Sequence, residues 1–417
     1  MDPTAITGVT ARKVFDSRGK ATVEVEIRTQ GGIGRFSSPT GTSKGRYEVM
    51  DLPKGGVEEA IKKVDRLLAP KLLGKNSSDQ EEIDSVIRDV DGTDNFRNIG
   101  GNTAYAASMA AADAAAKSLG KPLFAHLSGD SAKRMPLLLS NMISGGKHAL
   151  RSRCTIQEFL AIPVGARSFE EVVTSNLRVR ELASDFLNKR DPIFQGGMSI
   201  EEAWITSLTE EGALECLSEA CDRTSDETGV TVKIGVDVAA SSFWSDKDEA
   251  YVYKDGSKHS SGQHLDFLLD MMGKYPIVYV EDAFQEEDFE TFSEMTSKAG
   301  DRLICGDDLF VTNFDRLRKG IVRKACNSII IKPNQVGTLT DTRRTVEEAM
   351  RANYVPIASH RSGESCESHL AHVALAFNCP LLKLSVVGGE RLIKINELMR
   401  LAGSLDMKLA RFSLTAK

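Results

Sequence analysis

The pattern of hydrophobic and polar positions changes near residue 136. Before it, apolar residues alternate with polar ones over 6–15 and 22–28, and 31–36 forms a third run of this kind. Alternation with a period of two is typical of strands, so the first two runs predict a hairpin with its turn at 16–19. Helical periodicity follows at 57–68 and 78–90, and an alanine-rich helix is predicted at 102–117. Strands followed by helices indicate an α+β domain.

After residue 136, short apolar runs recur, and most are separated by helical segments. These runs cover 137–143, 159–163, 232–238, 276–280, 303–305, 328–331, 355–358 and 381–384. Short apolar runs that alternate with helices are typical of buried parallel strands, and eight of them predict a (β/α)₈, TIM-like barrel. We therefore predict an α/β protein with a small N-terminal α+β domain at 1–130 and a barrel domain at 131–417.

Composition narrows the classes of function. The 417 residues include 53 Lys and Arg against 59 Asp and Glu, a net charge of −6, which argues against general nucleic-acid binding. The seven cysteines are scattered and form no Cys-x-x-Cys pair, so we expect reduced thiols and a cytoplasmic protein. We expect no signal peptide and no membrane span, since no apolar run has the required length.

Polar and charged side chains stand at the ends of the predicted strands. Because successive strand ends of a barrel meet at one face, we expect these side chains to lie close together. They are Asp237, Glu281, Asp307, Lys332, His360, Arg361, Ser362 and Lys383, together with Gln157 and Glu158, which directly precede the second run.

Three of these side chains are carboxylates on consecutive predicted strands: Asp237, Glu281 and Asp307. A single acid at a strand end is usually a helix cap or a solvated carboxylate. Three carboxylates this close repel one another and would not all be ionised without a nearby positive charge. A bound divalent cation would supply that charge. All-oxygen ligands without cysteine or histidine favour Mg²⁺ over Zn²⁺. The three positions therefore predict a magnesium site.

Lys332 ends a buried run, and burial lowers the pKa of a lysine, which would make it a usable general base. The alternative is a side chain that extends from the strand end into solvent. A lysine beside carboxylates and a metal indicates proton abstraction next to a substrate carboxylate, with the metal and a second lysine stabilising the intermediate. Arg361 and Ser362 fit a phosphate or oxyanion clamp. His360 fits either a donor to the same group or a structural histidine.

The loop at 37–45 is polar and rich in small residues. Such a loop is either a mobile lid that carries hydroxyl groups over a ligand or a surface linker. The sequence leaves both interpretations open.

These stretches together resemble the enolase (phosphopyruvate hydratase) family. The matching segments are 16–19, 157–159, 235–241, 280–284, 306–313, 331–340, 359–364 and 389–397. They occur in the family's order over nearly the whole chain, and 386–390 is most similar to archaeal-type members. The resemblance implies a barrel whose second strand runs against the others. It also implies reversible dehydration of 2-phosphoglycerate to phosphoenolpyruvate in glycolysis and gluconeogenesis, by at least a homodimer.

The resemblance also implies roles for the metal-binding and catalytic residues. Asp237, Glu281 and Asp307 would hold the first Mg²⁺, and Ser43 in the lid would reach the second. Lys332 would remove the C2 proton. Two further residues of the catalytic set would be Glu158 and His360.

The substrate, a small phosphorylated carboxylate, would be held by other residues of the matching segments. Lys383 and the metals would bind its carboxylate, and Arg361 with Ser362 would bind its phosphate. Gln157 would line the site, and His148 would close over the substrate.

The chain differs from the family in the segment that supplies the acid for loss of the 3-hydroxyl group. The family's Gly-Asp-Glu-Gly-Gly motif is absent, and alignment on the Gly-Gly pair puts Gln195 at the position of the acid. Alignment on the distance to Asp237 puts Glu201 or Glu202 there instead. The segment from Ser199 to Glu202 also has the pattern of a helix capping box, and we expect that role for the glutamates. Residues 40–43, 150–153 and 384–385 differ from the family as well.

Three hypotheses follow from this pattern. The first is a working, diverged enolase, and the second is an enolase-fold paralogue that binds metal and ligand but has lost or altered catalysis. The third is another member of the superfamily that acts on a different carboxylate. The Arg361–Ser362 clamp and the lid argue against the third, and the persistence of the metal ligands with Lys332 and Lys383 favours the first.

Overall fold

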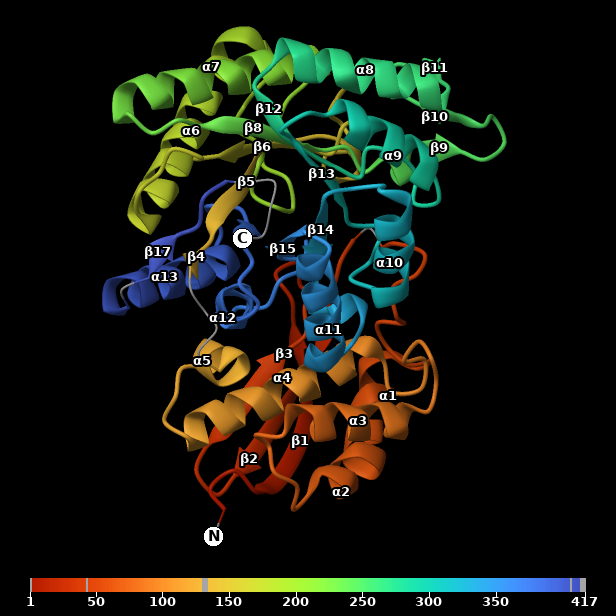
Figure 1. Ribbon diagram of the computed structural model, residues 1–417, viewed down its shortest axis with the longest axis vertical. Coiled ribbons are helices and arrows are strands. Elements are labelled where there is room, and N and C mark those ends of the chain that lie inside the picture. The colour runs from red at the N-terminus through yellow and green to blue at the C-terminus, as the bar shows by residue number, and fades with distance from the viewer. Residues whose placement is uncertain (1, 43, 130–133, 406, 413–417) are drawn as a thin grey trace.

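The computed structural model describes residues 2–42, 44–129, 134–405 and 407–412. The N-terminal part, red to orange in Figure 1, lies below the barrel, which is coloured yellow to blue. The junction that the sequence predicts between residues 130 and 131 lies outside the described residues.

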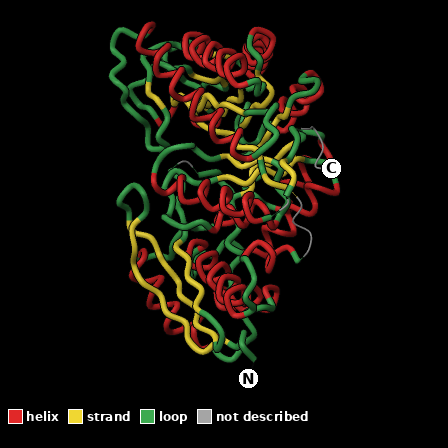
Figure 2. The backbone as a smooth tube through the Cα atoms, turned by 90° about the vertical axis from the view of Figure 1, so that its left-hand side faces the viewer, coloured by secondary structure: helices red, strands yellow, loops and turns green. Residues whose placement is uncertain are grey.

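An antiparallel three-stranded sheet opens the N-terminal part, and Figure 2 shows it as a long twisted ribbon. Its strands, in the order β1-β2-β3, are β1 (Ile6–Phe15), β2 (Ala21–Thr29) and β3 (Ile33–Ser37). The carboxylate of Asp16 closes the first turn because its Oδ1 accepts hydrogen bonds of 2.9 Å from the N–H groups of Arg18 and Lys20. The predicted hairpin is therefore confirmed.

Helices cover one face of this sheet. They are α1 (Gly56–Lys63), the π-helix η1 (Val64–Leu68), α2 (Ala69–Leu72), α3 (Gln80–Asp91), α4 (Gly101–Ser118) and α5 (Leu123–Ser128). The alanine-rich α4 is buried along almost its whole length and packs against β2 and β3. A Cβ at Gly34 would overlap the carbonyl oxygen of Ala110, so only glycine permits this close approach.

Eight strands close the barrel. They are β5 (Leu137–Ser144), β6 (Glu158–Ile162), β8 (Lys233–Asp237), β12 (Ile277–Glu281), β13 (Leu303–Gly306), β14 (Ser328–Ile331), β15 (Val355–Ser359) and β16 (Leu381–Lys383). Their order is β16-β15-β14-β13-β12-β8-β6-β5, and β16 also pairs with β5. The second strand, β6, is antiparallel to both neighbours, whereas the other pairs are parallel. The start of β6 therefore lies at the same rim as the ends of the other strands, as the resemblance implied.

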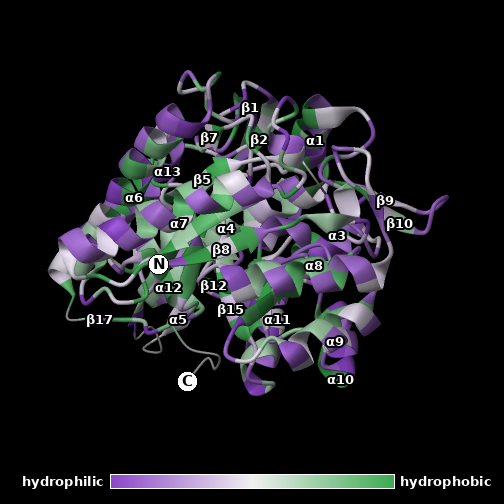
Figure 3. Ribbon diagram, turned by 90° about the horizontal axis from the view of Figure 1, so that it is seen from above, coloured by the Kyte–Doolittle hydropathy of each residue, from purple (hydrophilic) through white to green (hydrophobic). Residues whose placement is uncertain are grey.

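Amphipathic helices surround the barrel, and in Figure 3 helices such as α8 and α9 carry both hydrophilic and hydrophobic turns. The helices are α6 (Phe169–Arg190), α7 (Glu210–Thr228), α8 (Ser261–Lys274), α9 (Phe289–Lys298), α10 (Phe314–Arg323), α11 (Leu339–Arg351), α12 (His369–Ala376) and α13 (Gly389–Ser404). Five of them start at a Ser, Thr or Asn whose side chain accepts a backbone N–H of the first turn, namely Ser168, Thr209, Ser260, Asn313 and Thr338. No helix in the described ranges has the length and apolar character needed to cross a membrane.

Short elements complete the chain. The strands are β4 (Arg134–Met135), β7 (Trp204–Ile205), β9 (Trp244–Ser245), β10 (Ala250–Val252), β11 (Lys258–His259) and β17 (Lys408–Leu409). The 3₁₀ turns are η2 (Gly146–His148), η3 (Ala240–Ser242) and η4 (Pro333–Gln335).

The N-terminal part packs on the barrel at the start of α11. The carboxylate Oδ2 of Asp84 accepts hydrogen bonds from the N–H and the hydroxyl of Thr340, at 2.8 and 2.6 Å. The hydroxyl of Ser108 accepts the N–H of Leu339 at 3.1 Å. Because α11 follows β14, these bonds fix the N-terminal part beside the barrel rim where Lys332 lies.

Candidate active site

A polar cavity lies at the barrel rim where the strand ends meet. Two residues of the loop at 37–45, Gly41 and Thr42, also line it. Of the residues that the sequence singled out, the cavity is lined by His148, Gln157, Glu158, Asp237, Asp307, Lys332, His360, Arg361, Ser362 and Lys383. Glu281 is fully buried behind Lys383, and Ser43 lies outside the described residues.

Lys332 follows β14, and its ammonium donates a hydrogen bond to Oδ2 of Asp307, which follows the neighbouring strand β13. Both side chains are mostly buried, with 13% and 12% of their surface exposed. Burial lowers the pKa of Lys332, and the nearby negative charge, chiefly that of Asp307, raises it. The net result is a pKa above its usual value. The expectation of a lowered pKa is therefore wrong for this arrangement, because the nearby negative charge outweighs the effect of burial.

Lys383, at the end of β16, reaches into the barrel and contacts three carboxylates. Its Nζ lies 2.7 Å from Oδ2 of Asp237, 2.8 Å from Oε2 of Glu281 and 3.1 Å from Oε2 of Glu158. Asp237 and Glu281 are register partners on adjacent strands. Burial lowers the pKa of Lys383, but these carboxylates raise it well above its usual value. Burial and the charge of Asp237 raise the pKa of Glu281 to about 8.

The oxygen atoms around Lys383 and Asp307 fit a hard divalent cation. Oε1 of Glu281 is buried and accepts no hydrogen bond from any described residue. The Lys383 ammonium lies against two of the three predicted ligands, so the position already attracts positive charge. Carboxylate oxygens without sulfur or nitrogen donors are the ligands that Mg²⁺ prefers. The predicted metal ligands Asp237, Glu281 and Asp307 thus have suitable chemistry for this ion.

A second group of acids fixes the position of Asp307. Ligand oxygens of Asp282, Asp307 and Asp308 lie within 4.8 Å of one another. The two carboxylate oxygens of Asp282 accept the N–H groups of Asp307 and Asp308, each at 2.9 Å. The sequence pattern indicated no role for Asp282 or Asp308, although each directly follows a predicted ligand.

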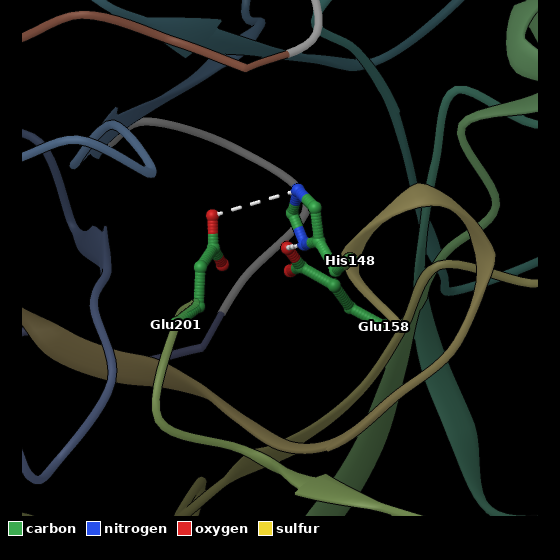
Figure 4. Close-up of side chains that lie close together, drawn as sticks. All are labelled: His148, Glu158 and Glu201. Atoms are coloured by element: carbon green, nitrogen blue, oxygen red, sulfur yellow. Dashed lines mark ion pairs between the residues drawn. The ribbon is translucent and has the colours of Figure 1, made fainter. Parts of the chain in front are cut away.

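Three buried side chains near the start of β6 form what we call the acid cluster: His148, Glu158 and Glu201 (Figure 4). His148 Nδ1 lies 3.2 Å from Oε1 of Glu158, and His148 Nε2 lies 3.8 Å from Oε1 of Glu201. Burial lowers the pKa of His148, but Glu201 and Glu158 raise it to about 9. Burial and the charge of Glu201 raise the pKa of Glu158 to about 7. The cluster therefore holds protons at neutral pH.

Glu201 belongs to this cluster because of the path of its loop. Burial raises its pKa, but His148 and His360 lower it well below its usual value. No helix begins at Ser199, so the capping-box interpretation is wrong. Instead, the hydroxyl of Ser199 accepts the N–H of Glu201 at 3.2 Å in a tight turn. The Asp191 carboxylate accepts the hydroxyl of Ser207 at 2.6 Å, which joins the two ends of the loop.

The other two residues considered for the acid position lie elsewhere. Gln195 is exposed, and Glu202 is half-buried outside the cavity lining. The structure therefore brings Glu201, and neither of these two, to the predicted site.

His360 joins the acid cluster from the end of β15. Its Nε2 lies 3.6 Å from Oε2 of Glu201. Its Nδ1 accepts a hydrogen bond of 3.4 Å from Nε of the fully buried Arg391. Since Nδ1 is an acceptor, the ring proton of neutral His360 lies on Nε2 and faces Glu201. Burial lowers the pKa of His360, which favours the neutral ring.

The predicted phosphate clamp is held by partners that sequence analysis missed. The Arg361 guanidinium donates to the Glu48 carboxylate at 3.1 Å and to Oδ1 of Asn334 at 2.9 Å. Ser362 Oγ accepts the N–H of Thr42 at 2.8 Å. Glu48 and Thr42 lie more than 300 positions before their partners in the chain, and no local pattern marks them.

Thr40, Gly41 and Thr42 of the predicted lid pack over the cavity. Thr40 and Gly363 form an antiparallel bridge, with N–H to carbonyl distances of 2.9 and 3.0 Å. Arg18 donates to the carbonyl of Thr40 at 3.0 Å and to the hydroxyl of Thr42 at 2.6 Å. These contacts place the loop against the site, as the lid interpretation requires, and they do not fit a surface linker.

Comparison with known proteins agrees with this geometry. The family described as "Enolase, N-terminal domain" matches residues 6–127, and the family described as "Enolase, C-terminal TIM barrel domain" matches residues 132–413. This chain belongs to the enolase family. The enolase of Methanosphaera stadtmanae is 48% identical over 402 residues, which cover 96% of this chain and 97% of that protein.

Two other archaeal enolases are similar over nearly their full length. That of Methanothermobacter thermautotrophicus is 46% identical, with 95% of this chain and 96% of that protein covered. That of Halorubrum lacusprofundi is 45% identical, with 96% and 99% covered. The match to enolases therefore includes both the N-terminal part with its lid and the barrel.

Gly41 tests whether this enolase needs a tightly fitted lid. A Cβ at Gly41 would overlap Nη2 of Arg361 and lie 2.7 Å from its Cζ. We expect Gly41→Ala to displace the lid or the guanidinium and to lower kcat/KM about 100-fold, since small misplacements of substrate-binding groups are costly. Steady-state kinetics check this expectation. Gly262→Ala, on the surface of α8 with no atom within 4 Å of the new Cβ, is the control. Equal kinetics for the two variants would contradict a fitted lid.

Proposed function

We propose that this chain catalyses the reversible dehydration of 2-phosphoglycerate to phosphoenolpyruvate, with Mg²⁺ as its cofactor. The observation that carries the proposal is the placement of Lys332 and the acid cluster. In the closed strand order, β14 and β6 are four strands apart in either direction, so Lys332 and Glu158 face each other across the barrel mouth. An elimination needs this arrangement, because one group removes a proton from C2 while another assists the hydroxyl that leaves C3.

Lys332 is the proposed base for the C2 proton. Asp307 orients the ammonium, and it is also a proposed ligand of the cation. With a cation bound to Asp307, this carboxylate would attract the Lys332 ammonium less and raise its pKa less, which would favour the neutral base. A lysine base with Mg²⁺ stabilising the negative charge on the substrate carboxylate is the known chemistry of the enolase superfamily.

The proposed acid side uses Glu201 in place of the glutamate of the missing family motif. Its carboxylate contacts His148 and His360, at 3.8 and 3.6 Å, and it stays ionised. Glu158, with a pKa of about 7, carries a proton at neutral pH in a substantial fraction of molecules. Environments that separate the pKa values of two carboxyl groups are typical of acid catalysis. We infer that the Glu158–Glu201 pair supplies the proton to the leaving hydroxyl.

The remaining cavity residues are proposed to hold the substrate. Lys383, beside the proposed metal ligands, would contact the carboxylate of the substrate, and Arg361 with Ser362 would contact its phosphate. Oε1 of Gln157 is buried without a hydrogen-bond donor among the described residues, which supports a polar contact with the ligand. His148 lies beside Glu158 and would close the site over the substrate.

The alternative of a ligand-binding paralogue without catalysis depended on the missing acid motif. Glu201 weakens this alternative because it supplies a buried carboxylate in contact with two histidines. The decisive test of substrate class is turnover with 2-phosphoglycerate compared with glycerate, which lacks the phosphate. We expect turnover of the phosphorylated acid only. Equal turnover of both would favour a different carboxylate substrate.

We also propose a cytoplasmic protein that is at least a homodimer. The cysteines that the structure describes are all free, and six of the seven are buried, which fits a reducing compartment. The oligomeric state rests on the family resemblance, and light scattering of the purified protein tests it.

Magnesium is expected to raise the melting temperature. A cation bound only by the folded state stabilises it, by ~2.7 kcal/mol when its concentration is 100 times its Kd. Asp237→Asn removes a proposed ligand charge and should reduce the shift, whereas Asp226→Asn, on the exposed face of α7, should leave it unchanged. Thermal melts with increasing Mg²⁺ check this. No shift in the wild type, together with an unchanged Asp237→Asn profile, would count against the metal site.

A further inference from the structure

Lys254 lies outside the cavity but is bonded to the loop that carries His148. It follows β10, in the turn between β10 and β11. Its ammonium donates hydrogen bonds to the backbone carbonyls of Gly146, Ala149 and Ser152, at 3.0, 3.1 and 3.0 Å. An ammonium has three N–H donors, so these carbonyls use all of them. The lysine therefore ties together three points of the segment 146–152, which we call the His148 loop.

The turn that presents this ammonium is itself fixed to the barrel. The N–H of Lys254 donates to the hydroxyl of Thr155 at 3.0 Å. The neighbouring Tyr253 is buried, and its hydroxyl lies 2.7 Å from Nδ1 of His264. The turn is closed by the N–H of Tyr253 donating to the carbonyl of Ser257 at 2.9 Å. Lys254 thus has a firm backbone from which to hold a neighbouring segment.

The His148 loop has few other constraints near its tip. Leu150 is 82% exposed, and Arg151 is exposed beside it. Backbone hydrogen bonds within the tip include the N–H of Ser152 to the carbonyl of Ala149, at 2.9 Å. The residues on either side of the exposed tip, Ala149 and Ser152, are buried, and the bonds to Lys254 join their carbonyls across the tip.

We propose that Lys254 is a positioning residue that holds the His148 loop in its substrate-binding conformation before substrate arrives. The proposal rests on the proposed role of His148 in closing over the substrate. Without the ammonium, only a fraction of molecules has His148 beside Glu158, and the apparent affinity falls by that fraction. Bound substrate restores the conformation, so the chemical step is affected much less than substrate binding.

The kinetic test replaces Lys254 with methionine, which keeps an unbranched apolar stem and removes the ammonium. Lys254 is an exposed residue, so the fold is retained. We expect Lys254→Met to raise KM for 2-phosphoglycerate about tenfold, with kcat changed less than about twofold. Lys258→Met is the matched control, because Lys258 lies on the same hairpin and pairs instead with Asp248 at 3.0 Å. An unchanged KM in Lys254→Met, or the same rise in the control, would overturn the proposal.

A double-mutant cycle tests whether Lys254 acts through His148. In a His148→Ala background the loop no longer carries the group that Lys254 positions, so we expect Lys254→Met to raise KM by less than about twofold. An equal rise in both backgrounds would show that Lys254 acts independently of His148 and would contradict the proposal.

Hydrogen exchange in the absence of substrate separates this inference from the proposed reaction. We expect amides of the His148 loop to exchange about tenfold faster in Lys254→Met, with other barrel amides unchanged. Unchanged exchange in the loop would overturn the positioning role, whatever the reaction is. Faster exchange without any turnover in the wild type would instead contradict the proposed function and leave the positioning of the loop intact.

Discussion

Lys332→Ala is expected to abolish turnover while the protein stays folded. The substitution removes the only group proposed to take the C2 proton, and general bases contribute roughly 10²- to 10⁴-fold to rates. We therefore expect kcat to fall about 1,000-fold or more. Because Lys332 sits at a strand end with part of its side chain exposed, its loss leaves the core packing unchanged. Steady-state turnover and exchange of the C2 proton with deuterated solvent measure the effect.

Turnover and exchange of the C2 proton should both be lost in the Lys332 variant, since removal of that proton precedes loss of the hydroxyl group. Lys298→Ala is the control, because Lys298 lies at the end of α9 and pairs only with Glu294 one turn earlier among the described residues. Wild-type turnover in Lys332→Ala, with a melting temperature near that of the wild type, would contradict the assignment of the base.

Glu201→Gln is expected to separate the two halves of the reaction. The amide keeps the shape of the side chain but lacks the negative charge that raises the pKa of Glu158 and of His148. We expect turnover to fall about 1,000-fold, while the C2 proton still exchanges with solvent because Lys332 is intact. The pKa of His148 should also fall below about 9, since Glu201 is the largest influence that raises it. Kinetics, solvent exchange and NMR titration of His148 measure the three effects.

Glu202→Gln is the control for the Glu201 variant because it changes the same side chain one position later, outside the cavity lining. A large loss of turnover in Glu202→Gln with none in Glu201→Gln would show that the loop places a different glutamate at the reaction. Loss of both proton exchange and turnover in Glu201→Gln would assign Glu201 to binding or to the base side.

The barrel and most of its site were predictable because the relevant information is local. Apolar runs at 303–305 and 328–331 became β13 and β14, with Asp307 and Lys332 at their ends. The geometry of a closed barrel then brings strand ends together without knowledge of any particular contact. Ten of the predicted residues consequently line one cavity.

The remaining features depend on contacts between distant segments. The raised pKa of Lys332 arises from Asp307, 25 positions earlier, and Arg361 pairs with Glu48, 313 positions earlier. The position of Glu201 was hard to predict for a different reason. Ser199 and Glu202 match a capping box, although no helix forms there. The path of that loop is set by contacts such as Asp191 with Ser207, which a local pattern does not reveal.

The most direct test of the proposed function is formation of phosphoenolpyruvate from 2-phosphoglycerate, measured with Mg²⁺ and again after chelation. We expect turnover that requires the metal and returns when Mg²⁺ is restored. Mg²⁺-dependent binding of 2-phosphoglycerate without turnover would contradict the proposed function, because the site would then hold its ligand without expelling the hydroxyl.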